Sequence, residues 1–430
     1  MKKEVVTLGV AGFGTVGTGL VKVLMANDEW IYKRIGKKIR IKKILVKDVN
    51  KKRDFLPPPE VKFTSNVDEI VEDPDIDIVV ELIGGKGVAK EVIVRSLENG
   101  KSVVTANKAL LAEEGKSLFD LAHKKGCALF YEASVGGGIP VIQTLKENLA
   151  SNKIKSITGI LNGTANYILS EMSNKGIDFK QALSQAQKLG YAEADPSFDI
   201  KGIDAAHKLV ILIQLAYGFF YPFDKLFIQG ISDVESYDIK MAKEFGYEIK
   251  LIAQVKERGG FLQAGVFPAL IKKDHMLAKV DGPFNAVLIE GNAVGPIMLY
   301  GQGAGDLPTG SSVLSDIMSI IRSYPHYNNT GFVEMDSKYE ILKEELTNWR
   351  HYFRFNVLDK PGVLSVISGI MGERNISIAQ VVQREEKKDG YVSVVFLTHV
   401  AQTKDVLSAL EEINRLEFVK EPSKHFRILK

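Results

Sequence analysis

Acidic and basic side chains are concentrated in one stretch near the middle of this 430-residue chain. Between Gly190 and Lys208 the sequence carries four carboxylates and two lysines. Asp204 and Lys208 are four residues apart, which places them on one face of a helix. The residues that follow, Leu209 to Ala216, are almost all apolar, so we expect this helix to be buried. A lysine held beside a carboxylate in such a helix can act as an acid or base, but a structural ion pair fits the same pattern.

A second lysine, Lys108, follows Ser102–Thr105, a short apolar segment that we expect to be a strand. Ligands of open α/β sheets bind beyond the carboxyl ends of the strands. Lys108 is therefore well placed to meet ligands bound at this edge of the sheet, and a surface lysine at the start of the next helix is the alternative.

Oxygen ligands for a hard cation are possible farther along. The expected strand Ala128–Glu132 leads into a segment with three consecutive glycines, which exposes backbone carbonyls beside the Glu132 carboxylate. A tight crossover between domains would have the same composition.

An apolar stretch from Val5 runs directly into a glycine-rich turn and then a helix. The turn comprises Gly12, Phe13, Gly14, Thr15, Val16 and Gly17. Gly12 permits the tight turn, Gly14 lets the backbone approach a pyrophosphate, and Gly17 lets the helix pack on the strand. The helix N-terminus adds free N–H groups. The pattern predicts a dinucleotide site; a purely structural glycine turn is the alternative.

The end of the next expected strand, Ile39–Val46, should face the adenosine ribose. Asp48 favours NAD, whereas the cluster of Lys47, Lys51 and Arg53 favours NADP, and a solvated loop is equally compatible. The expected cofactor is therefore NADP or NAD.

Alternating strands and helices must position these residues. We expect further strands at 76–83, which ends at Gly84, and at 154–161, and helices at 92–97 and 181–189. The dipeptide Asn162-Gly163 predicts a turn, with Thr164 as the N-cap of the following helix.

The last part of the chain predicts a separate module. A charged helix at 340–350 should be followed by a strand at 352–358, a helix at 363–371 and a hairpin of 376–384 with 391–400 around Lys387–Gly390. A helix at 404–413 and a last strand complete a βαββαβ order. We therefore expect an α/β protein with a Rossmann-like dinucleotide-binding domain (1–140, with 301–325 returning to it), an α+β substrate-binding and dimerisation domain (141–320), a linker (321–350) and the C-terminal domain (351–430).

Composition excludes several classes. The single cysteine, Cys127, excludes an internal disulfide and a cysteine-built zinc site, and it fits a reducing cytoplasm. The longest apolar run after the glycine-rich turn, Leu209 to Tyr221, is too short to cross a bilayer. A net charge of +3 is too small to indicate nucleic acid. We expect a cytoplasmic protein without a nucleic-acid or membrane partner.

Three long strings, 159–169, 186–196 and 199–209, resemble homoserine dehydrogenases, and the similarity covers nearly all of the first 320 residues. The resemblance implies reversible, NAD(P)-dependent reduction of L-aspartate 4-semialdehyde to L-homoserine, on the route to threonine, isoleucine and methionine. The chain departs from the family at Lys86–Ala89, where relatives usually place a proline before the alanine, which puts in doubt only the shape of a loop near the nicotinamide.

The resemblance also implies roles for individual residues. It makes Lys208 the catalytic lysine, acting with Asp204. The substrate site that it implies comprises Gly163, Thr164, Glu193, Asp199, Asp204 and Lys108. The cofactor site that we expect comprises the residues of the glycine-rich turn, Lys47, Arg53, Gly84, Lys108 and Gly305. The implied sodium site comprises Glu132, Val135, Gly137 and Ile139.

The turn Asp359–Gly362 and the segment Asn375–Ser377 resemble an ACT domain. The resemblance implies sheet-edge pairing between two copies, hence a homodimer or larger homo-oligomer, with an amino acid bound near Gly362 and Asn375. We expect inhibition by L-threonine; a dimerisation domain that binds nothing is the alternative.

Two other functions fit less well. An aspartate-semialdehyde dehydrogenase needs a nucleophilic cysteine, and Cys127 lies at the start of an apolar strand, as a core residue would. A non-catalytic nucleotide sensor would leave Glu193, Asp204 and Lys208 without a purpose.

Overall fold

The computed structural model describes residues 3–335, 337–384 and 390–429. The chain divides into two compact units, each built from three separate stretches. The first unit comprises residues 1–157, 207–225 and 284–338, and the second comprises 158–206, 226–283 and 339–430. Two elements are divided between the units: strand β7 (Ile154–Ile160) and helix α9 (Ile203–Tyr217).

A six-stranded parallel sheet forms the centre of the first unit, in the order β3-β2-β1-β4-β5-β6. Its strands are β1 (Val5–Ala11), β2 (Lys38–Leu45), β3 (Lys62–Thr64), β4 (Ile78–Glu81), β5 (Ser102–Thr105) and β6 (Leu129–Phe130). The apolar strands predicted from the sequence are confirmed, and β4 and β5 are buried along their whole length, as expected for strands covered on both faces.

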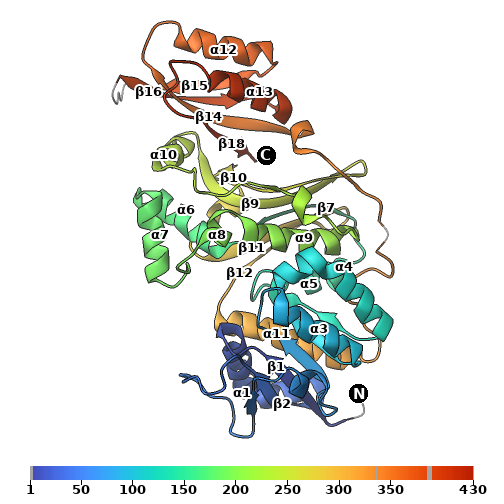
Figure 1. Ribbon diagram of the computed structural model, residues 1–430. Helices are drawn as coiled ribbons and strands as arrows, with labels where there is room; N and C mark the ends of the chain where they lie inside the picture. Colours follow the sequence, from blue (N-terminus) through green and yellow to red (C-terminus); the bar gives the residue numbers. More distant parts are fainter. Residues whose placement is uncertain (1–2, 336, 385–389, 430) are drawn as a thin grey trace. The chain divides into compact units, whose positions relative to one another are not determined.

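Helices connect and cover these strands (Figure 1). They are α1 (Thr15–Ile35), α2 (Asp68–Val71), α3 (Gly87–Glu98), α4 (Lys108–Lys125), α5 (Val141–Gln143) and α11 (Asp306–Ser323). α11 returns from far along the chain to pack on α1, and Val313, Ile317 and Ile320 join Leu20 and Val21 in one core. The unit also contains the hairpin of β11 (Phe284–Gly291) and β12 (Gly295–Gln302).

The second unit contains a sheet in which β9-β10-β18-β14-β16-β15 are successive neighbours. These strands are β9 (Tyr247–Arg258), β10 (Phe261–Lys272), β14 (Asn348–Leu358), β15 (Ile378–Gln383), β16 (Tyr391–Thr398) and β18 (Lys424–Ile428). Short strands β8 (Phe227–Ile228), β13 (Glu340–Ile341) and β17 (Ala401–Gln402) pair with β10 or β14. Helices α6 (Gly163–Lys175), α7 (Phe179–Lys188), α8 (Ser197–Ile200) and α10 (Ser236–Glu244) complete the part before residue 283.

The predicted βαββαβ order of the C-terminal module is confirmed. Helices α12 (Val363–Glu373) and α13 (Thr403–Ile413) lie together on one face of β14, β15 and β16 (Figure 1), where Phe355, Ile367 and Phe396 belong to a continuous core. The loop predicted at Lys387–Gly390 begins outside the described residues.

One edge strand of this module is paired within the chain. β18 lies between β14, to which it is antiparallel, and β10, to which it is parallel, with Ala269 opposite Arg427. Pairing of two copies through the edge of the module would therefore have to use the side of β15.

The charged helix predicted at 340–350 is wrong. This segment forms β13, a 3-10 turn at Glu344–Leu346 and the start of β14. The reason is tertiary pairing, since Trp349 is buried opposite Ala401 and the side chain of Arg427 bonds the Glu344 carboxylate. Strand pairing outweighs the helix propensity of the glutamates here.

Among the described residues, no helix is both long and apolar enough to cross a membrane.

Candidate active site

The glycine-rich turn has the geometry of a dinucleotide cradle. Gly12 adopts a φ of 105°, and a Cβ there would lie 2.6 Å from the carbonyl oxygen of Leu82. A Cβ at Gly17 would lie 2.5 Å from the oxygen of Gly12, so neither position tolerates a side chain. By contrast, a Cβ at Gly14, the N-cap of α1, would have no neighbour within 4 Å, which leaves open space at the helix N-terminus.

A buried carboxylate that the sequence analysis missed organises the loop after β4. One oxygen of Glu81 accepts hydrogen bonds from the backbone N–H groups of Ile83 (2.7 Å) and Gly84 (2.9 Å). The other oxygen accepts the hydroxyl of Thr105 at 2.6 Å. The loop at Gly84 is thereby fixed to the end of β5. The signal in the sequence was an acidic residue at the end of an apolar strand, because a carboxylate that is buried there needs hydrogen-bond partners.

The same loop is tied to the start of α4. Asn107 donates to the carbonyl of Gly85 (2.6 Å) and caps α4 by accepting from the N–H of Leu110 (3.2 Å). Lys108 is the first residue of that helix and is half-buried. Hydrogen bonds thus fix the backbone on both sides of the predicted nicotinamide contacts.

At the adenosine end, the structure gives Arg53 a role in holding its own loop. Its guanidinium donates to the backbone oxygens of Asp48 (2.6 Å) and Lys51 (2.8 Å) and lies 4.5 Å from the ring centroid of Phe63. Lys47 is exposed beside it. Both kinds of side chain remain at this end, so NAD and NADP both stay compatible with it.

In the second unit, Asn162 joins the acids predicted to bind substrate. Its amide donates to Asp199 (2.6 Å) and Asp204 (2.9 Å), while its oxygen accepts from the N–H of Ala165 at 2.7 Å. Asn162 is therefore the N-cap of α6, and the prediction that Thr164 is the cap is wrong. The hydroxyl of Thr164 instead donates to the carbonyl of Tyr191 at 2.6 Å. The dipeptide Asn162-Gly163 had indicated only a turn at this position.

Glu193 lies on the segment between α7 and α8 and is exposed. Its carbonyl accepts from the side chain of Gln187 at 3.2 Å, which fixes the backbone rather than the carboxylate. Gly163, the first residue of α6, is half-buried next to Asn162.

Helix α9 carries the predicted acid–lysine pair in its first two turns. Asp204 is 6% exposed and Lys208 is 8% exposed, although both are charged residues. The rest of the helix is almost entirely buried and apolar, which agrees with the pattern of the sequence. The hydrogen bond from Asn162 holds the Asp204 carboxylate, and helical spacing places Lys208 on the same face.

The loop predicted to hold sodium has oxygen atoms, but the Glu132 carboxylate is already used. Its two oxygens accept the N–H groups of Ile142 (2.9 Å) and Gln143 (2.8 Å) at the start of α5. Burial raises the pKa of this carboxyl to about 7, against the lowering effect of those two bonds. Among the described residues there is no group of three or more His, Cys, Asp or Glu side chains placed to hold a metal.

Backbone carbonyls are the remaining donors in that loop. The carbonyls of Gly137 and Ile139 each accept one bond, from the Ser312 hydroxyl (2.7 Å) and the N–H of Val141 (2.8 Å). A carbonyl oxygen has two lone pairs, so each keeps one for a cation. A cation at this loop would therefore rest on carbonyl oxygens and not on the Glu132 side chain.

A parallel sheet with a glycine-rich turn after its first strand and a buried acid–lysine pair on a later helix define an NAD(P)-dependent oxidoreductase. Residues 12–132 match the family model of the homoserine dehydrogenase NAD binding domain, residues 140–318 match that of homoserine dehydrogenase, and residues 351–418 match the ACT domain. The chain belongs to the homoserine dehydrogenase family.

Relatives match along the whole chain. The homoserine dehydrogenases of Neisseria gonorrhoeae and Helicobacter pylori are each 42% identical to it, over 97% and 100% of both chains respectively. The crystal structure of a homoserine dehydrogenase from Thiobacillus denitrificans has a TM-score of 0.92 at 41% identity and covers 99% of this chain and 98% of its own. A hyperthermophilic archaeal homoserine dehydrogenase in complex with NADPH has a TM-score of 0.64 at 30% identity, over 76% of this chain and 99% of its own.

Proposed function

We propose that this chain reduces L-aspartate 4-semialdehyde to L-homoserine reversibly, as a step toward threonine, isoleucine and methionine. The observation that carries this proposal is the hydrogen-bond network of Asn162, Asp199 and Asp204. Lys208 is buried one helical turn after Asp204 in α9. Family membership supports the reaction class, and the structural relative in complex with NADPH supports a nicotinamide cofactor.

The chain's residues supply the acid–base part of the reaction. A bound reduced nicotinamide supplies the hydride. As the aldehyde carbon gains that hydride, its oxygen becomes an incipient alkoxide that needs a positive, proton-bearing neighbour. In this proposal the Lys208 ammonium donates that proton, and Asp204 orients the ammonium. Lys108 adds a second positive charge, while Glu193 and Asp199 bind the substrate's amino end.

For the cofactor, the space above Gly14 fits a pyrophosphate. Lys47 and Arg53 beside Asp48 fit either ribose or its 2′-phosphate, so we propose that both NADPH and NADH are used. We also propose a sodium ion at the carbonyls of Glu132, Val135, Gly137 and Ile139, which would brace this loop. A cytoplasmic location stays a prediction from the cysteine content.

For regulation, we propose that L-threonine binds the C-terminal module. A cavity of about 150 Å³ lies beside Asp359–Gly362 and Gln383. Gly362, which lines this cavity, has a φ of 92°, and Asn375, in another turn of the module, has a φ of 56°. Replacement Gln383→Ala should raise the threonine concentration needed for half-inhibition by about tenfold. A homodimer is proposed with it, and sedimentation would measure the assembly.

The test of the activity is a single spectroscopic assay. Purified chain mixed with aspartate semialdehyde should oxidise NADPH or NADH, seen as loss of the reduced nicotinamide absorbance. The ratio of the two kcat/KM values reports the cofactor preference. A folded protein that oxidises neither cofactor would refute the proposal.

A further inference from the structure

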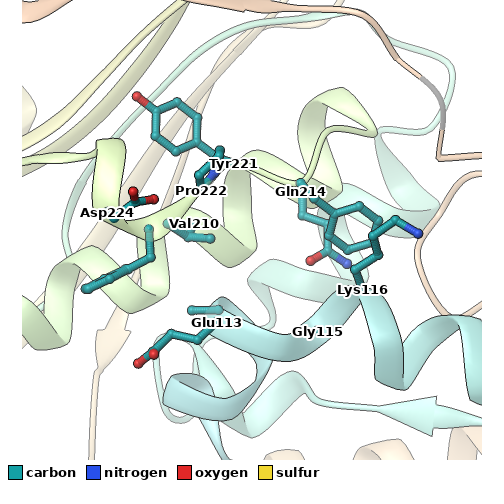
Figure 2. A pocket seen from close by; sticks show the side chains of 11 residues that line it. Glu113, Gly115, Lys116, Val210, Gln214, Tyr221, Pro222 and Asp224 are labelled. Atoms are coloured by element: carbon teal, nitrogen blue, oxygen red, sulfur yellow. The ribbon is translucent and has the colours of Figure 1, made fainter.

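A cavity of about 420 Å³ lies in the first unit between α4, the second half of α9 and the segment 220–224 (Figure 2). None of its lining residues belongs to the substrate, cofactor or cation sites considered above. The walls combine aliphatic and aromatic groups, such as Val210 and Phe223, with charged groups at the rim. A cavity of this volume can enclose a small molecule.

The charged groups are separated by sign. In Figure 2, Asp224 and Glu113 lie toward one side of the cavity, whereas Lys116 and Gln214 lie toward the other. Asp224 is exposed at the rim, and no hydrogen bond or ion pair engages its carboxylate within the described chain. A ligand that carries a positive and a negative group would meet opposite charge at each end.

Gln214 gives an independent sign that something binds. Its side chain is 2% exposed, lines the cavity, and its amide nitrogen has no hydrogen-bond partner among the described residues. A buried donor left without a partner is costly and uncommon in native structures. An amide N–H needs an acceptor, so the ligand should present an oxygen at this end.

The other two charged groups, Lys116 and Glu113, each have an exposed partner. Lys116 pairs with Asp120 at 2.8 Å, but both side chains are about two-thirds exposed, so this pair is weak. Glu113 pairs with Lys86, which is half exposed, and one of its oxygens lies 3.4 Å from Nε2 of His207. The exposed partners Lys86 and Asp120 can exchange for a ligand, whereas His207 is buried and keeps its contact with Glu113.

The cavity uses a different face of α9 from the proposed catalytic pair. Val210 and Gln214 line the cavity, and they share one helical face with His207 through the i, i+3, i+7 spacing. At 3.6 residues per turn this face lies about 100° around the helix from that of Asp204 and Lys208. The cavity and the acid–lysine pair are therefore separate sites on the same helix.

We propose that this cavity binds a small zwitterion, an aliphatic amino acid in its ammonium–carboxylate form. The ammonium group lies between Asp224 and Glu113, and the carboxylate accepts hydrogen bonds from Gln214 and Lys116. The aliphatic part packs on Val210 and Phe223. Because Glu113 also contacts His207, which precedes Lys208 in α9, an occupied cavity is linked to that helix.

Three probes of equal chain length test the proposal by calorimetric titration of the full chain. L-2-aminobutyrate carries both charges, n-butylamine only the positive one and butyrate only the negative one. Wild-type protein should bind L-2-aminobutyrate at least tenfold more tightly than either single-charge probe. Equal binding of n-butylamine and L-2-aminobutyrate would overturn the proposal.

Variants separate this cavity from other sites that accept amino acids. Asp224→Asn and Gln214→Leu should each weaken or remove one class of L-2-aminobutyrate sites, whereas Asp274→Asn, an exposed acid elsewhere, should leave every site intact. Gln214→Glu should repel the carboxylate and shift the preference toward n-butylamine. Thermal unfolding confirms that each variant is folded, and Asp224→Asn, at the rim, keeps the test decisive if a Gln214 variant fails to fold.

Unchanged affinity in folded Asp224→Asn and Gln214→Leu would refute the site. The titration needs neither cofactor nor turnover. Its failure is therefore distinct from failure of the proposed dehydrogenase activity.

Discussion

Two of the clusters that place buried carboxylates beside a cation differ in how the carboxylates are satisfied. In the second unit, Asp238 is fully buried and accepts the Tyr352 hydroxyl (2.9 Å) and two guanidinium nitrogens of Arg354 (2.7 and 3.2 Å). The guanidinium also bonds Glu235 at 2.7 Å. Burial raises the pKa of Asp238, and the charge of Arg354 opposes that rise. Because Asp238 and Arg354 are buried and bonded to each other and to protein side chains, we call this the closed cluster.

The cluster on α9 is open by comparison. Asn162 holds Asp199 and Asp204, but Asp199 is only half-buried, and the adjoining segment with Glu193 is exposed. Burial and charge pairing therefore do not by themselves identify catalysis. The difference lies in whether the charged groups continue to a surface that a ligand can reach.

The largest expected effect separates the two clusters by turnover. Lys208→Ala should lower kcat by about 10²- to 10⁴-fold while the KM for the cofactor changes little, because only proton donation is lost. Steady-state kinetics measure both values. Lys201→Ala, which removes an exposed lysine of the same segment, is the matched control. Near-normal turnover of Lys208→Ala would show that α9 carries a structural pair like that of Asp238.

The converse change should affect stability and not chemistry. Arg354→Ala leaves Asp238 buried without its cation, which costs about 3–5 kcal/mol of unfolding free energy. Denaturant titration measures the loss, and kcat per folded molecule should stay normal. Glu235→Gln, at the exposed side of the same guanidinium, should cost less than about 1 kcal/mol. A similar loss in both variants would contradict the closed-cluster interpretation.

Asn162 tests whether orientation of the acids matters. Asn162→Ala removes the donors to Asp199 and Asp204 together with the cap of α6, and we expect roughly tenfold lower kcat/KM. The helix cap alone is worth about 1 kcal/mol of stability. Asp178→Ala, which removes the cap of α7, provides that stability loss without touching the acids. If Asn162→Ala and Asp178→Ala have the same kcat/KM, Asn162 acts only as a helix cap.

The last prediction concerns the pH dependence of stability at two neighbouring histidines of the C-terminal module. The imidazoles of His351 and His425 are 2.9 Å apart, and burial, with the charge of Arg427, lowers the pKa of His351 to about 3. Between pH 6.5 and 3 the unfolded state binds a proton that the folded state refuses, so stability falls as pH falls. Each pH unit in this window should cost up to about 1.4 kcal/mol.

Chemical denaturation at a series of pH values measures that slope. His351→Gln should make the slope shallower without removing it, because burial also lowers the pKa of His425 well below its ordinary value. His326→Gln, which changes an exposed histidine, should leave the slope as it is. The same slope in His351→Gln and wild type would assign the acid sensitivity to other groups.

The sequence predicted the elements that depend on local pattern. The β1 strand, the turn at Gly12 and the buried strands β4 and β5 follow from apolar runs and glycine spacing, and so does the order of the C-terminal module. The pair Asp204 and Lys208 was also found, because helical spacing alone places it on one face.

What escaped prediction depends on contacts between distant residues. Asn162 contacts acids about 40 positions away, and Glu81 contacts Thr105 on the neighbouring strand, so spacing along the chain does not indicate either contact. The helix predicted at 340–350 failed for the same reason, since strands far along the chain pair with this segment. The long hairpin of β9 and β10 was not predicted at all.

The pairing of β18 with β10 makes the end of the chain a stiff mechanical link. Backbone hydrogen bonds join Ala269 and Leu270 to the last described strand, so a tilt of that strand is passed directly to the central hairpin, without a flexible tether that would absorb it. The C-terminal module is therefore joined to β10 by shared sheet hydrogen bonds as well as by the connecting chain. Removal of the residues after 340 would leave the edge of β10 that pairs with β18 exposed, and an unpaired sheet edge promotes aggregation.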